Sequence, residues 1–257
     1  MSNKKKITDS YNGYASKWVK RMREGKNSAH EYLEKPAMYK LLPDLNDKQV
    51  LCVGCGSGEE CEYLRKLGAQ RVVGIDLAEK LIEIAERDFP ECEFKVMDIE
   101  KLEFPDGSFD FIYSSLVMHY LHDWNKALNE TYRVLRTGGV YLFSTHHPFF
   151  NGTENSKDES GRVRLYGYRE DRNKNLTIYG DYYSEILIDD AWFDGEFEIS
   201  YYHRPFESMF RDIIASGFRL VDYVEPRPVE SSSEYDRYLY EVHSRIPLFV
   251  IFKLMKS

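Results

Sequence analysis

Short apolar runs alternate with stretches of helical periodicity between residue 49 and residue 145 of the chain. The apolar runs, each of which predicts a strand, lie at residues 49–53, 71–75, 93–97, 109–114 and 141–145. Amphipathic stretches at residues 57–67 and 78–88 predict two helices, and a third begins at Asp123 and is closed by Gly138 and Gly139. Strands separated by helices pair in parallel, so this pattern predicts an α/β fold with helices on both faces of a doubly wound sheet.

Two helical segments are expected before the first strand. Asp9 or Ser10 can cap a first helix through a side-chain oxygen. A second helix starts at Ser28 and is interrupted at Pro36, which can restart a helical turn. Together the two segments form an N-terminal extension over residues 1–45.

The regular alternation stops after the fifth strand. Residues 147–204 are polar and rich in Gly, Asp and Tyr, and alternating runs at 176–179 and 196–202 predict antiparallel strands. Doubly wound sheets bind ligands beyond the carboxyl ends of their strands, so an insertion at this point is placed to cover a second substrate. We therefore expect residues 1–257 to form a single domain with one insertion.

The sheet is expected to continue after the insertion. Pro205 begins a helix that runs to Gly217, and apolar runs at 218–224 and 247–252 predict two further strands. These strands can complete the sheet with one antiparallel member.

A glycine loop follows the first predicted strand. Gly54, Gly56 and Gly58 allow a sharp turn into the next helix and let a ligand approach bare backbone. Asp76, 18 residues beyond Gly58 at the end of the second strand, can accept hydrogen bonds from ribose hydroxyls. Glu59 stands where a dinucleotide-binding protein has a third glycine, and its charge opposes a pyrophosphate at the helix N-terminus. The loop therefore favours a nucleoside ligand without phosphate.

At these residues the chain resembles the class I S-adenosylmethionine-dependent methyltransferases. The resemblance begins with the glycine loop at residues 50–58 and the acidic Asp76. It extends to Val96–Ile99 and to residues 104–112, which resemble the segment that holds adenine and the fourth strand with its preceding turn. Residues 10–145 carry most of this similarity.

The resemblance implies a Rossmann-like methyltransferase fold, with a mostly parallel, seven-stranded sheet. It also implies that residues 1–45 form a helical lid over the cofactor. The cofactor is then S-adenosylmethionine, the product is S-adenosylhomocysteine, and the chain is an enzyme that transfers a methyl group. Cys52 departs from the pattern, since many relatives carry Asp at this position.

The resemblance further implies a set of cofactor-binding residues. Asp76 would hold the ribose, Asp98 the adenine amino group, and Ile99 would lie beside the adenine ring. The alternative is that Asp76 and Asp98 only form turns at strand ends. Aromatic faces of Tyr11 and Tyr14 could attract the sulfonium by about 0.5–2 kcal/mol. The full set of cofactor candidates is Tyr14, Gly54, Cys55, Gly56, Gly58, Asp76, Leu77, Asp98, Ile99, Ser114 and Ser115.

Methyl transfer from a sulfonium is an in-line displacement that mainly requires alignment of the reactants. A base is needed only if the acceptor must lose a proton, and His119 can serve as that base or can simply line the pocket. His147 could face the acceptor or pack at the base of the insertion, and Arg204 could bind a substrate carboxylate or pair with an acid of the insertion. The candidates for the acceptor side are Tyr11, His119, His147, His203 and Arg204.

Two further patterns suggest metal or redox chemistry. Cys52 and Cys55 form a C-x-x-C motif, but Cys52 falls inside an apolar strand and no second pair completes a zinc site. We interpret both as buried thiols. His119, His122 and Asp123 lie close in sequence but lack a clear further ligand, so we expect no metal.

The bulk composition limits the partners. The 257 residues are 42% hydrophobic and carry a formal net charge of −8, which argues against a nucleic-acid partner. No apolar run approaches 18 residues and the N-terminus lacks a signal-peptide core, so we expect a cytoplasmic protein without membrane contact. We expect a monomer or homodimer that acts on a small molecule through an oxygen, nitrogen or carbon nucleophile. Ser114–Val117 lacks the Asn/Asp-Pro-Pro-Tyr motif, which counts against adenine or glutamine acceptors.

Two other functions remain open. The chain could be a non-catalytic module that binds S-adenosylmethionine, with the insertion as a contact surface for another protein. It could also be a nicotinamide-dependent oxidoreductase, although Glu59 opposes a pyrophosphate and no Tyr is followed four residues later by Lys.

Overall fold

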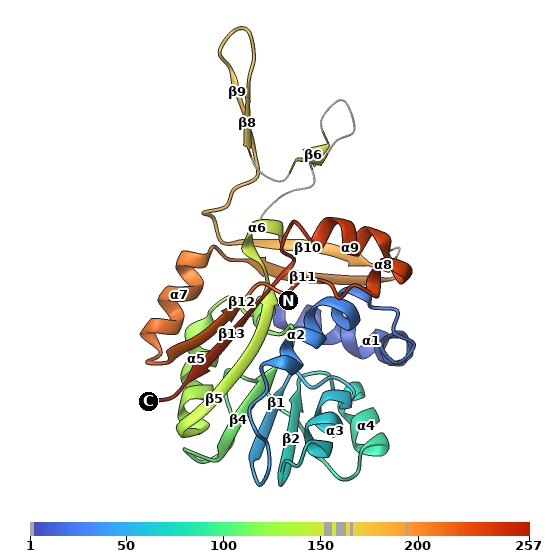
Figure 1. Ribbon diagram of the computed structural model, residues 1–257, viewed down its shortest axis with the longest axis vertical. Coiled ribbons are helices and arrows are strands. Elements are labelled where there is room, and N and C mark those ends of the chain that lie inside the picture. Colours follow the sequence, from blue (N-terminus) through green and yellow to red (C-terminus); the bar gives the residue numbers. More distant parts are fainter. Residues whose placement is uncertain (1–2, 152–155, 158–162, 165–166, 194) are drawn as a thin grey trace.

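A computed structural model of the chain describes residues 3–151, 156–157, 163–164, 167–193 and 195–257. Its centre is a seven-stranded sheet with the strand order β12-β13-β5-β4-β1-β2-β3 (Figure 1). The strands are β1 Gln49–Val53, β2 Arg71–Asp76, β3 Glu93–Val96, β4 Phe109–Ser114, β5 Leu135–His146, β12 Arg219–Val224 and β13 Phe249–Met255. Strands β1 to β5 pair in parallel, and β13 runs antiparallel to both β5 and β12. The predicted sheet, with its one antiparallel member, is confirmed.

Helices cover both faces of this sheet (Figure 1). They are α1 Asn3–Arg23, a π-helical segment His30–Glu34, α2 Lys35–Lys40, α3 Glu59–Lys66, α4 Glu79–Asp88, α5 Trp124–Val134 and α7 Phe206–Ala215, and the shorter α6 Pro148–Asn151, α8 Ser232–Tyr235 and α9 Arg237–His243. Alternate residues of β1 enter different cores, as the twofold period of a strand requires. Leu51 and Val53 pack with Trp124 of α5, whereas Val50 and Cys52 pack with Leu64 of α3.

Two predicted element boundaries are wrong. Helix α5 ends at Val134, and Gly138 and Gly139 lie inside the long strand β5. Both glycines pair there with Lys256 after β13, and a Cβ on Gly139 would lie 2.8 Å from the carbonyl oxygen of Arg136. The glycines therefore allow close backbone contact between β5 and the residue after β13, and they do not cap the helix.

Helix α1 begins at Asn3, six residues before the predicted cap at Asp9 or Ser10. Its first turns are held by tertiary contacts, because Lys4 forms ion pairs with Asp98 and Glu100. These contacts outweigh the local capping signal. The second predicted helical segment is present and continues through Pro36, which lies in the first turn of α2.

Among the described residues between β5 and α7 there are three small antiparallel pairs. They are β6 Ser156–Lys157 with β7 Val163–Arg164, β8 Gly167–Glu170 with β9 Leu176–Tyr179, and β10 Ile186–Trp192 with β11 Phe197–His203. The β8–β9 hairpin projects away from the body of the molecule, whereas β10 and β11 lie across it beside α1 (Figure 1). Strands β9 and β11 coincide with the two predicted alternating runs, and part of the predicted 147–204 insertion falls outside the described residues.

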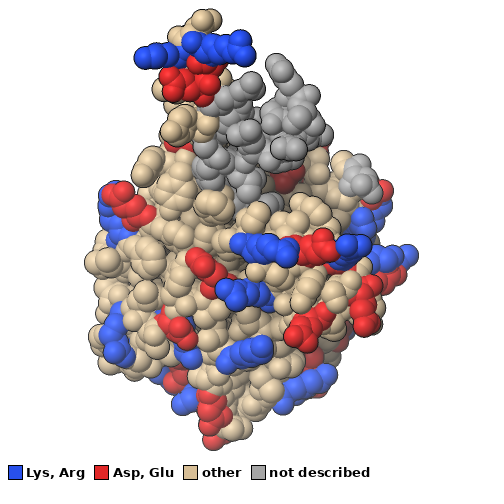
Figure 2. Space-filling model, turned by 45° about the horizontal axis from the view of Figure 1, so that its top comes forward, with Lys and Arg blue, Asp and Glu red and all other residues tan. Residues whose placement is uncertain are grey.

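The molecular surface carries charges of both signs. On the face drawn in Figure 2, acidic and basic side chains are interspersed among other residues and form no large field of one sign. None of the helices in the described ranges has the length and apolar character needed to cross a bilayer.

Candidate active site

The loop between β1 and α3 turns through three glycines with positive φ, at +63° for Gly54, +53° for Gly56 and +91° for Gly58. A Cβ on Gly54 would lie 2.2 Å from the Cγ2 atom of Val117, so this position has no room for a side chain. A Cβ on Gly56 would meet no atom within 4 Å. The loop backbone at Gly56 is therefore open to a ligand.

Asp76, at the end of β2, is bonded to this loop. Its Oδ2 accepts a hydrogen bond from the backbone N–H of Gly56 at 3.0 Å, and its Oδ1 accepts from Ala78 at 2.8 Å. Burial raises the pKa of Asp76, and the backbone donors oppose this shift without cancelling it. The carboxylate thus holds the loop backbone in place, which is the turn-forming role that was the alternative in the sequence analysis. It also lines a cavity.

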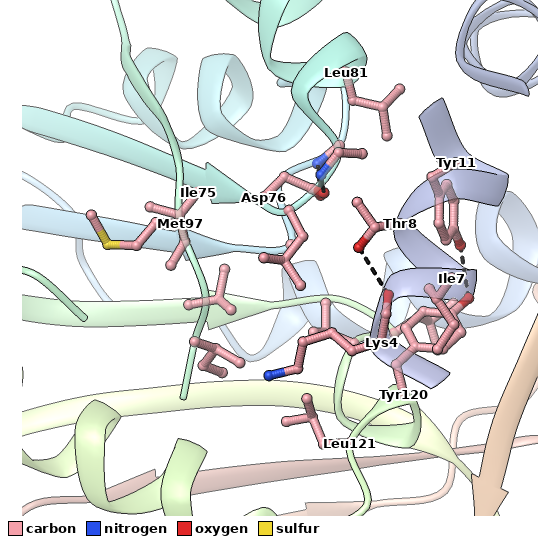
Figure 3. Close-up of a pocket in the computed structure, with 18 of the residues that line it drawn as sticks. Lys4, Ile7, Thr8, Tyr11, Ile75, Asp76, Leu81, Met97, Tyr120 and Leu121 are labelled. Carbon is pink, nitrogen blue, oxygen red and sulfur yellow. Dashed lines mark hydrogen bonds between the residues drawn. The ribbon is translucent and has the colours of Figure 1, made fainter. Parts of the chain in front are cut away.

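This first cavity lies between helix α1 and the ends of β1 and β2. Figure 3 shows Lys4, Ile7 and Tyr11 of α1 on one side, opposite Asp76 and Met97 on the other. The hydroxyl groups of Tyr11 and Tyr120 lie 2.7 Å apart. The residues that line the cavity are Lys4, Ile7, Thr8, Tyr11, Trp18, Val53, Gly54, Gly56, Ile75, Asp76, Leu77, Ala78, Leu81, Met97, Ile99, Ser115, Leu116, Val117, Tyr120 and Leu121.

The first cavity brings together many of the residues predicted to bind a nucleoside. Those that line it are Gly54, Gly56, Asp76, Leu77, Ile99 and Ser115. Five others lie elsewhere: Cys55 lines the second cavity, described below, and the remaining four line neither cavity. Gly58 precedes α3 as its N-cap, and Ser114 is buried at the end of β4. Tyr14 faces the β10–β11 hairpin, where its hydroxyl donates to Glu196 at 3.0 Å, and Asp98 is covered by Lys4 at 2.6 Å.

A second, more polar cavity adjoins the glycine loop on its other side. His30 lies between two carboxylates here, with its Nε2 atom 3.4 Å from Oε1 of Glu60 and 3.5 Å from Oε2 of Glu34. Burial acts to lower the pKa of His30, but Glu60 and Glu34 outweigh it and raise the pKa above its ordinary value. The lining residues are Trp18, Met22, His30, Glu31, Lys35, Gly54, Cys55, Gly56, Ser57, Glu59, Glu60, Ser115 and Leu116. Cys55, a predicted cofactor residue, lies here.

A buried hydrogen-bond network supports the loop after β4. Glu34 accepts hydrogen bonds from the hydroxyls of Ser115 at 2.9 Å and Ser144 at 2.5 Å. Ser144 accepts in turn from the backbone N–H of Leu116 at 2.9 Å. Leu116 has a φ of +55°, a conformation that non-glycine residues rarely adopt and that surrounding bonds must hold. Sequence reasoning missed Glu34 and His30, because their positions in a helix of the extension resemble ordinary amphipathic spacing.

A third cavity lies beyond Leu116, between the loop after β4 and the β10–β11 hairpin. Its lining residues are Trp18, Asn27, Ala29, Leu116, His119, Tyr120, His146, Asp190, Trp192, Phe193, Tyr201, Leu248 and Phe249. The rings of His119 and His146 stack with centroids 3.7 Å apart, and the Tyr201 ring meets His146 edge-on at 4.6 Å. Asp190 Oδ2 accepts from the Tyr201 hydroxyl at 3.0 Å and from the Trp192 indole at 2.9 Å. His119, the predicted base or pocket residue, lines this cavity.

The other residues predicted for the acceptor side do not line the third cavity. Arg204 is buried over Trp124 and donates to Asp212 at 2.5 Å, so its guanidinium has a structural partner in α7. His203 contacts the carbonyl oxygen of Tyr182 at 2.9 Å. The remaining two candidates are His147, which contacts Glu225 at 3.1 Å, and Tyr11, which lines the first cavity.

The cysteines and histidines show no metal-binding arrangement within the described part of the chain, where no three His, Cys, Asp or Glu side chains are grouped to hold an ion. All four cysteines are free and buried, which confirms the interpretation of Cys52 and Cys55 as buried thiols. Burial raises the pKa of Cys52 and brings the pKa of Cys92 to about 11, so these thiols stay protonated and weakly reactive.

Fold and site together define a class I S-adenosylmethionine-dependent methyltransferase, with a glycine loop after β1 and an acidic residue after β2 facing one cavity. Residues 51–143 match the family described as Methyltransferase domain. The chain belongs to this class of enzymes, and its cofactor is S-adenosylmethionine.

Similar proteins include named methyltransferases. A crystal structure of an S-adenosylmethionine-dependent methyltransferase from Mesorhizobium loti has a TM-score of 0.71 and 26% sequence identity, and covers 90% of this chain and 99% of its own. An uncharacterized protein of Haemophilus influenzae is 29% identical over 98% of this chain and 97% of its own length. A malonyl-[acyl-carrier protein] O-methyltransferase of Yersinia pestis is 38% identical, but over only 44% of this chain and 40% of its own length.

Proposed function

We propose that the enzyme transfers a methyl group from S-adenosylmethionine to a small-molecule acceptor held in the third cavity. The observation that carries this proposal is that Trp18 and Leu116 line all three cavities. A methyl donor in the first two cavities would then present its reactive end to the third at these two residues. The interspersed surface charges in Figure 2 also favour a small acceptor over a nucleic acid.

The residues of the first cavity suit the nucleoside part of the cofactor. The carboxylate of Asp76 can accept hydrogen bonds from the ribose, and the open backbone at Gly56 leaves room for the ligand. Leu77, Met97 and Ile99 offer apolar walls to the adenine. When bound, S-adenosylmethionine supplies an activated methyl group on a positively charged sulfur, which the aromatic face of Trp18 can stabilise.

The second cavity suits the amino acid part of the cofactor. Its ammonium group requires acidic partners, and Glu59, Glu60 and Glu31 line this cavity. Its carboxylate requires cationic partners, and Lys35 and His30 line the same space. This pairing of both signs distinguishes the second cavity from the apolar first one.

We further propose that residues 1–45 act as a lid and that the 147–204 region covers the acceptor. Helix α1 bridges the two sides of the site, since Asn12 accepts from the backbone N–H of Lys80 at 2.9 Å and Lys6 pairs with Asp189 of β10 at 2.7 Å. At the C-terminal end of α1, Arg23 pairs with Glu59 at 2.7 Å. Exposed ion pairs of this kind are weak, and α1 also packs through apolar residues against β11 and α4. Opening of the lid would separate both kinds of contact and let the cofactor enter and its product leave.

Incubation of the purified protein with methyl-labelled S-adenosylmethionine and a fractionated small-molecule extract tests the proposal. We expect label in a small organic product and calorimetric binding of S-adenosylhomocysteine. Tight binding without any transfer would support the non-catalytic module. Binding of a nicotinamide dinucleotide in place of S-adenosylhomocysteine would support the oxidoreductase and overturn the proposal.

A further inference from the structure

The residues that line the third cavity limit the class of acceptor that it can bind. We propose that it binds an uncharged molecule built on a flat ring with a hydroxyl group, and that His119 receives the proton of that hydroxyl. This inference rests on the proposed function, because it takes the third cavity as the acceptor site. Shape, charge and unpaired polar atoms each support it.

The walls of the third cavity are largely aromatic. Rings reach it from four separate parts of the chain, namely α1, the loop after β4, the β10–β11 hairpin and the start of β13. They belong to Trp18, Tyr120, Trp192, Phe193, Tyr201 and Phe249. The stacked rings of His119 and His146 add a further flat surface. Aromatic walls favour a flat ring ligand, which can stack or meet them edge-on.

The charge of the third cavity excludes an acidic acceptor. None of the described residues that line it is Lys or Arg. Its acidic group is Asp190, whose carboxylate accepts hydrogen bonds from Tyr201 and Trp192. A ligand carboxylate would be buried here without a cation and beside a like charge, which is strongly unfavourable.

The unpaired polar atoms call for a ligand that can form hydrogen bonds. His119 is only 2% exposed, yet neither of its ring nitrogens has a hydrogen-bond partner. Native proteins rarely leave such buried groups unpaired, and each one lowers stability until a ligand or water meets it. A neutral imidazole has one nitrogen that accepts a proton, and a ligand hydroxyl is its natural donor.

The proposed reaction is methyl transfer from sulfur to a hydroxyl oxygen. The hydroxyl oxygen forms a bond to the methyl carbon as the carbon–sulfur bond breaks, the sulfur keeps that electron pair, and the hydroxyl proton passes to a ring nitrogen of His119. Burial and the neighbouring His146 hold the pKa of His119 well below 6.5, so it is a weak base. A hydroxyl on an aromatic ring gives up its proton more easily than one on an alkyl chain, so it is the kind of hydroxyl that such a weak base can deprotonate.

The test compares 2-naphthol with 2-naphthoate, which share a ring system and differ in charge. Binding is followed through the fluorescence of Trp18 and Trp192, with and without saturating S-adenosylhomocysteine. We expect 2-naphthol to bind at least tenfold more tightly than 2-naphthoate. Equal or tighter binding of 2-naphthoate, or binding of neither probe by protein that still binds S-adenosylhomocysteine, would overturn the acceptor class and leave the proposed function standing. Failure to bind S-adenosylhomocysteine would instead overturn the proposed function.

Variants assign the preference to individual side chains. We expect His119→Phe, which keeps a flat ring but removes the nitrogens, to weaken 2-naphthol at least fivefold while S-adenosylhomocysteine binds within twofold of wild type. His119→Gln restores a polar atom and should recover part of the loss, which a purely structural role of His119 would not produce. Asp190→Asn should improve 2-naphthoate binding severalfold. The exposed Tyr183→Phe is the matched control, and unchanged 2-naphthol binding in both His119 variants would contradict the assigned role.

Discussion

The imidazole rings of His119 and His146 lie parallel, 3.7 Å between centroids and 5° between planes, with His119 in the turn after β4 and His146 at the end of β5. Two cationic imidazoles at this distance would repel each other, and burial penalises each charge further. Burial accordingly holds the pKa of His119 well below 6.5 and lowers the pKa of His146 to about 3, against a small opposing effect of Asp190. Both rings are therefore neutral at physiological pH, and each has one nitrogen that can accept a hydrogen bond.

This pair predicts a loss of stability in mild acid. Below pH 6.5 the unfolded chain takes up a proton at each of these histidines, whereas the folded chain does not, so the free energy of unfolding falls as the pH falls. Between pH 7.5 and 5.5 the loss is about 1.4 kcal/mol for each histidine. Urea unfolding at both pH values measures it. The double variant His119→Phe, His146→Phe should lose clearly less than wild type, and identical losses in the two proteins would contradict neutral histidines in the folded state.

The glycine loop predicts a second outcome, for which the chain supplies its own control. Gly56 and Gly138 both have positive φ, at +53° and +77°, and a Cβ on either would meet no atom within 4 Å. Alanine at either position should therefore cost about 1–2 kcal/mol of stability from backbone strain alone. Only Gly56→Ala places its methyl group in the first cavity, so it should weaken S-adenosylhomocysteine at least tenfold by calorimetry. Equal binding by the two variants would mean that the loop at Gly56 does not contact the cofactor.

Much of the fold was predictable because its signals are local and repeated. Apolar runs separated by helical stretches identify the parallel strands, because parallel strands need crossover connections. The glycine loop identifies the first of these strands. The end of α5 was not predictable from Gly138 and Gly139, because both glycines serve a contact with Lys256 that lies far away in sequence. The start of α1 depends in the same way on the distant Asp98.

Some residues of the candidate site could likewise be predicted from the sequence, and others could not. Asp76 and the loop glycines form the first cavity through segments close in sequence, and their grouping follows from the strand order. Arg204 looks like a carboxylate-binding residue in sequence. In the fold its guanidinium pairs with Asp212 of α7 and lies over the ring of Trp124 of α5. Glu34 gives no sequence signal, since only the fold brings it to Ser115 and Ser144.

Asp76 has two roles that substitution can separate. Asp76→Ala removes the ribose acceptor and leaves the N–H groups of Gly56 and Ala78 without their bonds, so we expect no detectable S-adenosylhomocysteine binding and a loss of about 1–3 kcal/mol in stability. Asp76→Asn keeps one oxygen acceptor and should stay closer to wild type in thermal unfolding, while binding falls at least tenfold. Calorimetry and thermal melts on both variants distinguish the roles, and wild-type affinity in Asp76→Ala would remove Asp76 from the cofactor site.

Lys4 predicts how the site opens. Its ammonium lies 2.6 Å from Asp98 and also pairs with Glu100, so it occupies the carboxylate expected to receive the adenine amino group (Figure 3 shows Lys4 at the cavity). Lys4→Ala should release Asp98 and loosen the start of α1, and both changes speed the entry and exit of S-adenosylhomocysteine.

Stopped-flow fluorescence from Trp18 can measure these two rates. We expect both to rise severalfold in Lys4→Ala, with a smaller change in affinity, because the same helix covers the cavity before and after binding. Lys20→Ala is the matched control, since Lys20 lies in α1 with its acidic partner Glu24 one turn away in sequence at 3.9 Å. Equal rates in the two variants would show that the contact between Lys4 and Asp98 does not limit access, and the opening of α1 would then depend on its contacts at Lys6 or Arg23.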